Sequence, residues 1–196
     1  MLIHLLKNKA LNAKIRECFK KHEKEILDII LFGSVVRGKE KPKDIDILIL
    51  FKERENLEIA YQIRKEVEQL HIQASITTKT YTSLMAKSFP AREAYLSEGY
   101  SLVYARGIAE GLGYATYTLF KYELKGFTPS RRTQFHYSLQ GRSKKEGMSK
   151  ELRLIKFANT ILLSPMENTE RTRAYLEYWN IKFEEAPILL PARFIA

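Results

Sequence analysis

The sequence predicts an α+β protein, in the broad sense an α/β arrangement, in which short buried strands alternate with amphipathic helices. Strand-like runs, which are apolar or alternate with a period of two, lie at 27–32, 44–51 and 71–78. Helical segments, in which apolar residues recur every three or four positions, lie at 11–26, 56–70 and 81–96. Each predicted strand is therefore followed or preceded by a helix that can cover the sheet.

Glycines at 107, 111 and 113 indicate a domain boundary. We therefore predict one domain over residues 1–104 and a smaller, basic α+β domain over residues 105–196. In the second domain the expected elements are strands at 114–125 and 159–164, a helix at 169–179 and an extended segment at 181–190. Residues 131–141 fit either a strand or a helix by periodicity.

Composition indicates a folded protein with a packed core, because 45% of the 196 residues are hydrophobic and 11% are aromatic. No apolar run approaches the ~20 residues of a membrane span, so we expect no membrane association. The first six residues are apolar and basic residues follow, whereas a secretory signal has the opposite order. The single cysteine, Cys18, excludes an internal disulfide and a cysteine-based zinc cluster. We expect a soluble, cytoplasmic protein.

Positive charge is concentrated in one segment. The formal net charge is +10, and residues 121–156 hold 10 Lys/Arg against 3 Asp/Glu. Such an excess favours a polyanionic partner such as RNA, DNA or a nucleotide.

The chemistry-bearing motif of the first half is Gly33-Ser34 followed by Asp44-Ile45-Asp46. A Gly-Ser turn after a strand offers backbone N–H groups and a hydroxyl to phosphate oxygens. Two Asp one residue apart on a strand point to the same face, roughly 7 Å apart. Mg²⁺ prefers such hard oxygen ligands, completed by phosphates and water.

Arg37 and Lys43 lie between the two halves of this motif, where they can neutralise phosphate charge. A Gly-Ser turn alone is ordinary, and Asp-x-Asp alone could be two solvated residues on an edge strand. Together, between two buried strands, they favour a nucleotide site. We therefore expect Gly33, Ser34, Arg37 and Lys43 to bind the nucleotide.

The stretch from Ile30 to Gly38, followed by Asp44 to Ile49, resembles the DNA polymerase β nucleotidyltransferase superfamily, most closely the minimal nucleotidyltransferases of prokaryotes. Nine residues separate Ser34 from Asp44, within the range of that family. The resemblance covers roughly residues 10–104, and the stretches Phe89–Arg92 and Glu98–Leu102 are similar to the end of such domains. It implies a palm with a mixed sheet flanked by helices, ATP or another NTP as substrate, and Mg²⁺ (or Mn²⁺) held by catalytic Asp44 and Asp46.

The family also implies a third carboxylate on the next strand, which activates the acceptor hydroxyl. The corresponding segment, 70–77, contains no acid, and Gln73 best matches the missing position. An amide cannot accept a proton near neutral pH. His71 is an alternative base, although a histidine at the start of a strand is commonly just half-exposed.

The basic segment combines cations with aromatic residues, which can pair with phosphates and stack on bases. The alternative is an aromatic core beneath a solvated face. We expect the glycine-bounded loop 141–147 to contact nucleic acid. The predicted nucleic-acid-binding residues are Arg131, Arg132, Arg142, Lys144 and Lys145.

Three functions fit these features. The first is a metal-dependent nucleotidyltransferase acting on an RNA hydroxyl, or on a toxin-type partner protein as the resemblance to antitoxin nucleotidyltransferases implies. The second is a catalytically impaired palm that serves as a nucleic-acid-binding or scaffold protein, favoured by the missing third carboxylate. The third is transfer to a small-molecule acceptor, which leaves the basic segment unexplained.

Overall fold

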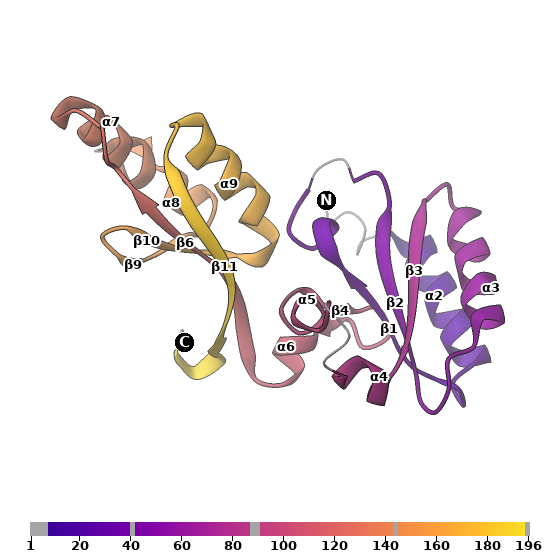
Figure 1. Ribbon diagram of the computed structural model, residues 1–196. Coiled ribbons are helices and arrows are strands. Elements are labelled where there is room, and N and C mark those ends of the chain that lie inside the picture. Colours follow the sequence, from indigo (N-terminus) through magenta and orange to yellow (C-terminus); the bar gives the residue numbers. More distant parts are fainter. Residues whose placement is uncertain (1–7, 40–41, 87–90, 143–144, 195–196) are drawn as a thin grey trace. The chain divides into compact units, whose positions relative to one another are not determined.

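The computed structural model describes residues 8–39, 42–86, 91–142 and 145–194. The chain forms two compact units, Met1–Tyr114 and Ala115–Ala196, and each is described by itself (Figure 1). None of the helices formed by the described residues combines the length and apolar character needed to cross a bilayer.

The first unit is built on a five-stranded sheet with the order β3-β2-β1-β4-β5. β1 pairs antiparallel with β2 and with β4, whereas β2 and β3 are parallel. The strands are β1 Ile26–Phe32, β2 Ile45–Phe51, β3 Ala74–Thr80, β4 Tyr100–Ser101 and β5 Arg106–Gly107. A short 3₁₀ turn, η1, spans Gly33–Val35.

Helices cover both faces of this sheet (Figure 1). α2 (Lys9–Lys21) and α3 (Leu57–Glu68) lie on one face; α4 (Tyr81–Met85), α5 (Arg92–Glu98) and α6 (Ile108–Gly111) belong to the other. On the α5 face, strand residues of even number pack with the helices in a cluster of Ile30, Leu48, Leu50 and Leu84, joined by Phe32, Tyr95 and Ile108. The predicted mixed sheet flanked by helices is thereby confirmed.

Some boundaries differ from those predicted. The helix expected over 81–96 is two helices, because Ala86 adopts an extended backbone and ends α4; residues 87–90 lie outside the described residues. β3 begins at Ala74 rather than at 71, because His71 has a positive φ of 60° in the turn after α3. The predicted domain boundary at 104/105 falls before β5, which pairs with β4, so residues 105–114 belong to the first unit.

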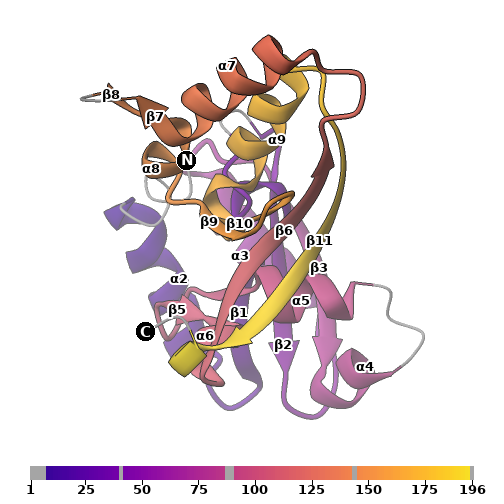
Figure 2. The same ribbon diagram turned by 90° about the vertical axis from the view of Figure 1, so that its left-hand side faces the viewer.

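The second unit has a four-stranded sheet with the order β11-β6-β10-β9. The strands are β6 Tyr114–Glu123, β9 Ile155–Ala158, β10 Ile161–Pro165 and β11 Lys182–Pro191. The helices α7 (Pro129–Gln140) and α9 (Thr169–Tyr178) belong to the same unit (Figure 2). The minor elements are β7 Gly141–Arg142, β8 Lys145–Glu146, α8 Met148–Glu151, η2 Met166–Asn168 and η3 Ala192–Phe194.

Segment 131–141, which periodicity left open, is largely helical. Thr128 caps α7 by accepting a hydrogen bond from the Arg131 N–H at 3.3 Å, and Pro129 occupies the first turn, where its missing N–H costs nothing. Phe135 and Leu139 lie one turn apart and are 0% and 1% exposed. α7 is therefore anchored by one apolar stripe.

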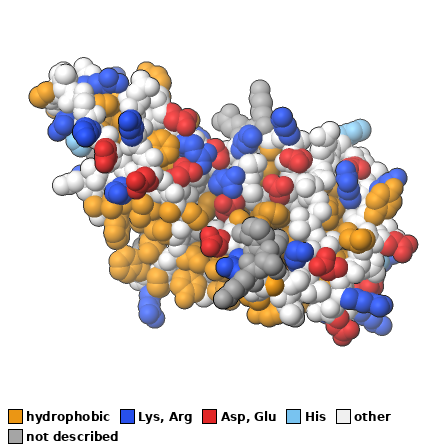
Figure 3. Space-filling view, in the orientation of Figure 1, with side chains coloured by type: hydrophobic (Ala, Val, Ile, Leu, Met, Phe, Trp, Pro, Cys, Tyr) orange, Lys and Arg blue, Asp and Glu red, His pale blue; other side chains and the backbone are white. Residues whose placement is uncertain are grey.

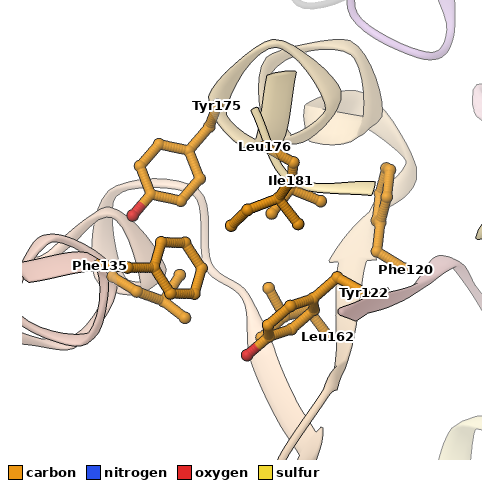
Figure 4. Close-up of a cluster of buried hydrophobic side chains, with 8 residues drawn as sticks. Phe120, Tyr122, Phe135, Leu162, Tyr175, Leu176 and Ile181 are labelled. Atoms are coloured by element: carbon orange, nitrogen blue, oxygen red, sulfur yellow. The ribbon is translucent and has the colours of Figure 1, made fainter. Parts of the chain in front are cut away.

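The core of the second unit lies between the sheet and these helices (Figure 4). Phe120 and Tyr122 of β6 and Leu162 of β10 meet Phe135 of α7 and Tyr175 of α9. Burial of such side chains contributes roughly 1.5–3 kcal/mol each. Of the aromatic residues in segment 121–156, Tyr122 and Phe135 are thus core residues, whereas Tyr137 is 45% exposed.

Candidate active site

The two aspartates lie at the start of β2, next to the end of β1. Asp46 is paired in register with Phe32, the last residue of β1. Its neighbours Ile45 and Ile47 are buried, at 3% and 0% exposed. Because strand side chains alternate, Asp46 shares the face of Leu48, which packs toward α4 and α5. Asp44 is exposed and precedes the strand on the same alternation.

Gly33 meets Asp46 so closely that no side chain fits between them. A Cβ at Gly33 would lie 2.4 Å from Asp46 Oδ2, and Gly33 has a φ of +80°. Its carbonyl accepts hydrogen bonds from the N–H groups of Val36 and Arg37, at 3.0 and 3.3 Å. Glycine is therefore required here both by backbone conformation and by space. Ser34 follows within the same tight turn and is half-buried.

Negative charge accumulates around Asp46. Burial raises the pKa of this carboxyl first, and the charge of Asp44 raises it further. Arg37 lowers the pKa and Glu98 raises it, so both side chains lie within electrostatic reach. A bound cation would offset the cost of keeping these carboxylates ionised.

Arg37 is held by an ion pair with Glu98 of α5, whose carboxylate lies 2.7 Å from the guanidinium. The Glu98 side chain is 10% exposed. The structure thus places the predicted phosphate ligand Arg37 against a buried acid. Lys43, the other predicted cation, is exposed beside Asp44.

Glu98 was not predicted as a site residue, because it lies 52 positions beyond Asp46 (98 − 46). One sequence signal accompanies it: the following glycine. A Cβ at Gly99 would lie 2.2 Å from the Tyr95 carbonyl oxygen and 2.9 Å from Ile108. Gly99 allows α5 to pack closely, and this brings Glu98 to Arg37.

The parallel register of β2 and β3 locates the place of the expected third carboxylate. Asp46 is paired with Ser75, and the Ile45 N–H donates to the Gln73 carbonyl at 2.9 Å. Gln73 and Ser75 thus flank the two aspartates, and neither is an acid. His71 lies in the turn before them and is exposed. Among the described residues, no group of three or more His, Cys, Asp or Glu could hold a metal ion.

The donor set fits a divalent cation that arrives with a triphosphate. Mg²⁺ commonly takes one or two protein carboxylates and completes its shell with phosphate oxygens and water. Asp44 and Asp46 supply two carboxylates; burial and then the charge of Asp44 raise the pKa of Asp46, and a cation between the two carboxylates would offset both effects. Gln73 could add a weak amide ligand.

The predicted nucleic-acid-binding residues of the second unit contact different groups within the protein. Arg131 donates to the Trp179 carbonyl at 3.0 Å and lies 4.4 Å from the Phe127 ring centroid. Arg132 donates to the Leu124 carbonyl at 3.3 Å instead. Arg142 lies 4.8 Å from the Tyr137 ring centroid and is paired in register with Lys145. Lys144 lies outside the described residues.

In a comparison with known protein families, the matching residues lie within the first unit. Residues 13–92 match the model of the family described as "Polymerase beta, Nucleotidyltransferase". No curated protein matches the chain.

Two solved structures resemble part of the chain. The first is a crystal structure of a mutant of the toxin-antitoxin MntA-HpeT; it is 16% identical, has a TM-score of 0.37 and covers 46% of this chain and 70% of that one. The second is a crystal structure of a toxin-antitoxin with AMP-PNP; it is 19% identical, also has a TM-score of 0.37 and covers 46% and 71%. The family match covers residues 13–92, fewer than half of the 196 residues of the chain, and lies within the first unit.

Proposed function

We propose that the first unit transfers a nucleoside monophosphate from ATP or another NTP to a hydroxyl acceptor, with Mg²⁺ or Mn²⁺ as the metal. The observation that carries this proposal is the contact between Gly33 and Asp46, which leaves no room for a Cβ. The chain keeps a tight turn directly against a partly buried carboxylate whose pKa is raised by burial, and a cation bound with a triphosphate would stabilise the ionised form of that carboxylate.

Each residue has a role in this proposal. Ser34 and the turn N–H groups bind phosphate oxygens, while Lys43 supplies positive charge at the open side. Asp44 and Asp46 hold the metal that, when bound, neutralises charge on the transferred phosphoryl group. Arg37, fixed by Glu98, orients the triphosphate from the α5 side.

In this proposal the site lacks an identified general base that would remove the proton from the acceptor hydroxyl. Neither Gln73 nor Ser75, which flank the aspartates, accepts a proton near neutral pH. We therefore expect slow transfer. General-base assistance contributes typically 10²–10⁴-fold, and a Gln73→Asp or Ser75→Asp variant that speeds transfer would identify the position that lacks it.

RNA is the acceptor we favour, because residues 121–156 carry a net charge of +7 from 10 basic and 3 acidic residues. Of the predicted contacts, we carry Arg132 forward as an RNA contact, whereas Arg131, Arg142, Lys144 and Lys145 form the alternative set with which it is compared below. A partner protein of the toxin type is the variant acceptor within the same reaction class. We place the protein in the cytoplasm, where NTP and RNA are both present.

The test is transfer from radiolabelled ATP or CTP, with Mg²⁺, to total RNA or to protein. Asp44→Asn and Asp46→Asn should each reduce labelling by about 10²–10³-fold, by analogy with loss of a key electrostatic group. Glu53→Gln is the matched control, because Glu53 is an exposed carboxylate just beyond the other end of β2. Labelling that survives both aspartate substitutions contradicts the proposed site.

The second candidate is a catalytically impaired palm that binds nucleic acid or acts as a scaffold. The observation in its favour is the pair Gln73 and Ser75 where a third carboxylate is expected. It predicts no label in any acceptor pool, together with salt-dependent RNA binding that is unchanged in Asp44→Asn and Asp46→Asn.

A further inference from the structure

The second unit contains a cavity of about 640 Å³ between the end of β6, α7 and the turn that joins β9 to β10. Its lining includes Lys121 and Lys125, Arg132 and His136, and Lys156. Most of these cations were not among the predicted ligands. Figure 3 shows Lys and Arg side chains gathered with a histidine over the part of the molecule where α7 lies.

The fold itself brings the cations together. Arg132 and His136 lie one turn apart on α7, so they share a helix face, while Phe135 is turned into the core. Lys156 is paired in register with Leu162, a core residue on the face that packs against the helices. Lys156 therefore lies on the same face of the sheet as Leu162, at the edge strand.

The floor of the cavity is fixed before any ligand binds. The Tyr122 hydroxyl donates to the Asn159 carbonyl at 3.0 Å, and the Tyr122 N–H donates to the Thr160 carbonyl at 2.9 Å. Arg132 is held at the rim by its hydrogen bond to the Leu124 carbonyl. Such preorganisation lowers the ordering cost of binding.

The lining carries an unbalanced positive charge. Four Lys/Arg residues face one acid, Glu123, so the Lys, Arg and Glu side chains of the lining carry a net charge of +3. Lys121 pairs with Glu184 at 3.1 Å, but both side chains are more than half exposed, so the pair contributes little. No other carboxylate of the described residues lines the cavity.

We propose that this cavity is the site at which the second unit binds phosphate groups of single-stranded nucleic acid. Its volume lies within the ~300–1,000 Å³ of small-ligand sites, which exceeds the need of one phosphate and suits a nucleotide-sized segment. Tyr122, the one Phe, Tyr or Trp among the described residues of the lining, is 1% exposed, so it offers no ring to a base. Binding is therefore through phosphates and insensitive to sequence. The inference rests on the proposed function in taking RNA as the ligand, but it requires no transfer.

The test uses the full chain and a fluorescein-labelled oligouridylate, followed by anisotropy over a series of salt concentrations. The cavity variant Arg132→Gln with Lys156→Gln should bind at least about tenfold more weakly, and its slope of log K against log salt should fall by roughly 1.4, about 0.7 for each lost phosphate contact. The matched control Arg142→Gln with Lys145→Gln removes the same charge from the β7–β8 hairpin and should lose less than about threefold. Circular dichroism verifies that each variant is folded.

A more specific comparison uses single substitutions at two adjacent residues, Arg131 and Arg132. Arg132→Gln should weaken binding, whereas Arg131→Gln, which removes an equal charge held at the Trp179 carbonyl, should not. Equal losses in both pairs would mean that only overall charge matters, and the cavity assignment would be wrong. Loss confined to the hairpin variant overturns the cavity but leaves RNA binding by this unit intact.

Two further outcomes distinguish a free nucleotide from nucleic acid as the ligand, and distinguish this inference from the proposed nucleotidyl transfer. If the cavity substitutions weaken binding of free ATP but not of the oligonucleotide, the ligand is a free nucleotide and the nucleic-acid assignment fails. If the unmodified protein does not bind the oligonucleotide, this inference fails. Labelling of a protein acceptor that depends on Asp46 would then still support nucleotidyl transfer.

Discussion

The two units build their candidate sites in different ways. In the first, Gly33 and Asp46 lie within 14 residues of chain, and one strand pairing between β1 and β2 brings them together. In the second, the cavity draws residues from β6, α7 and the β9–β10 turn, between Lys121 and Thr160. A site made by one local turn can be predicted from a sequence motif. A site made by packing between distant elements can be identified only from the folded structure.

The electrostatics of the sites are opposite as well. Asp44, Asp46 and Glu98 concentrate negative charge in the first unit. Burial, the charge of Asp44 and the charge of Glu98 all raise the pKa of Asp46. The cavity of the second unit concentrates cations. In the functions proposed above, the first arrangement would bind a metal with its triphosphate and the second a phosphate backbone, so the two units would bind different reactants.

The largest expected effect tests whether the cavity depends on the core beneath it. Phe135 is fully buried, and its ring centroid lies 5.7 Å from that of Tyr122 and 5.6 Å from that of Trp179. Phe135→Ala should lower the free energy of unfolding of the second unit by about 3–5 kcal/mol, measured by urea denaturation. RNA binding should be lost with it, since Arg132 and His136 flank this residue on α7.

The control is Phe157→Ala, at a residue that is 54% exposed, which should change stability by less than about 0.5 kcal/mol. ATP binding to the first unit should survive Phe135→Ala. Loss of both activities together would break the comparison, because the two sites would then depend on one core.

A second effect belongs to the first unit alone. Asp28 on β1 is 6% exposed, and its Oδ1 accepts hydrogen bonds from the Ser101 hydroxyl at 2.7 Å and the Ile29 N–H at 2.8 Å. Burial raises the pKa of this carboxyl from 3.8 to about 6, against the opposing effect of the hydrogen bonds. Asp28→Asn keeps an oxygen acceptor and should stabilise the unit at pH 7 by about 3 kcal/mol.

The direction of the pH dependence follows from the raised pKa. The native state holds the proton more tightly than the unfolded chain, so this contribution to stability is complete below pH 3.8 and is lost as pH rises through about 6. The difference between Asp28→Asn and the unmodified protein, from denaturation at several pH values, should therefore shrink to near zero at pH 3.5. A difference that does not vary with pH would contradict burial of an ionised Asp28.

A third prediction addresses the turn that defines the first site. Gly33→Ala places a methyl group 2.4 Å from Asp46 Oδ2 at a φ of +80°. The strained backbone should lower stability by about 1–3 kcal/mol, and displacement of Asp46 should reduce ATP binding far more than that change in stability explains. Gly126→Ala is the matched control, because Gly126 has a φ of +86° with nothing near its Cβ. If both variants bind ATP alike, space beside Asp46 is not what Gly33 provides.

These contrasts show which features the sequence could predict. The Gly33–Asp46 arrangement needed only strand alternation and a glycine turn, so motif spacing was sufficient for the palm. The split of the 81–96 helix depended on the extended backbone of Ala86, and the start of β3 depended on a left-handed His71; neither has a strong local signal. Glu98 and Lys156 lie in their sites because elements distant in the chain pack together. The periodicity of the sequence does not predict such packing.

The smallest expected effect concerns the Arg37–Glu98 ion pair, which joins α5 to the turn that follows η1. The Arg37 and Glu98 side chains are 31% and 10% exposed, so the pair is partly shielded from water. If Glu98 acts by positioning Arg37, then Glu98→Gln and Arg37→Gln should each raise the Kd for ATP several-fold, and the double variant should be no worse than Arg37→Gln alone. A coupling of about 1 kcal/mol is expected for contacting residues. A purely structural Glu98 would instead lower stability without changing the Kd for ATP, and additive losses would mean that Glu98 acts on Asp44 and Asp46 directly. Because Glu98 also raises the pKa of Asp46, that outcome would move the missing third carboxylate from β3 to α5.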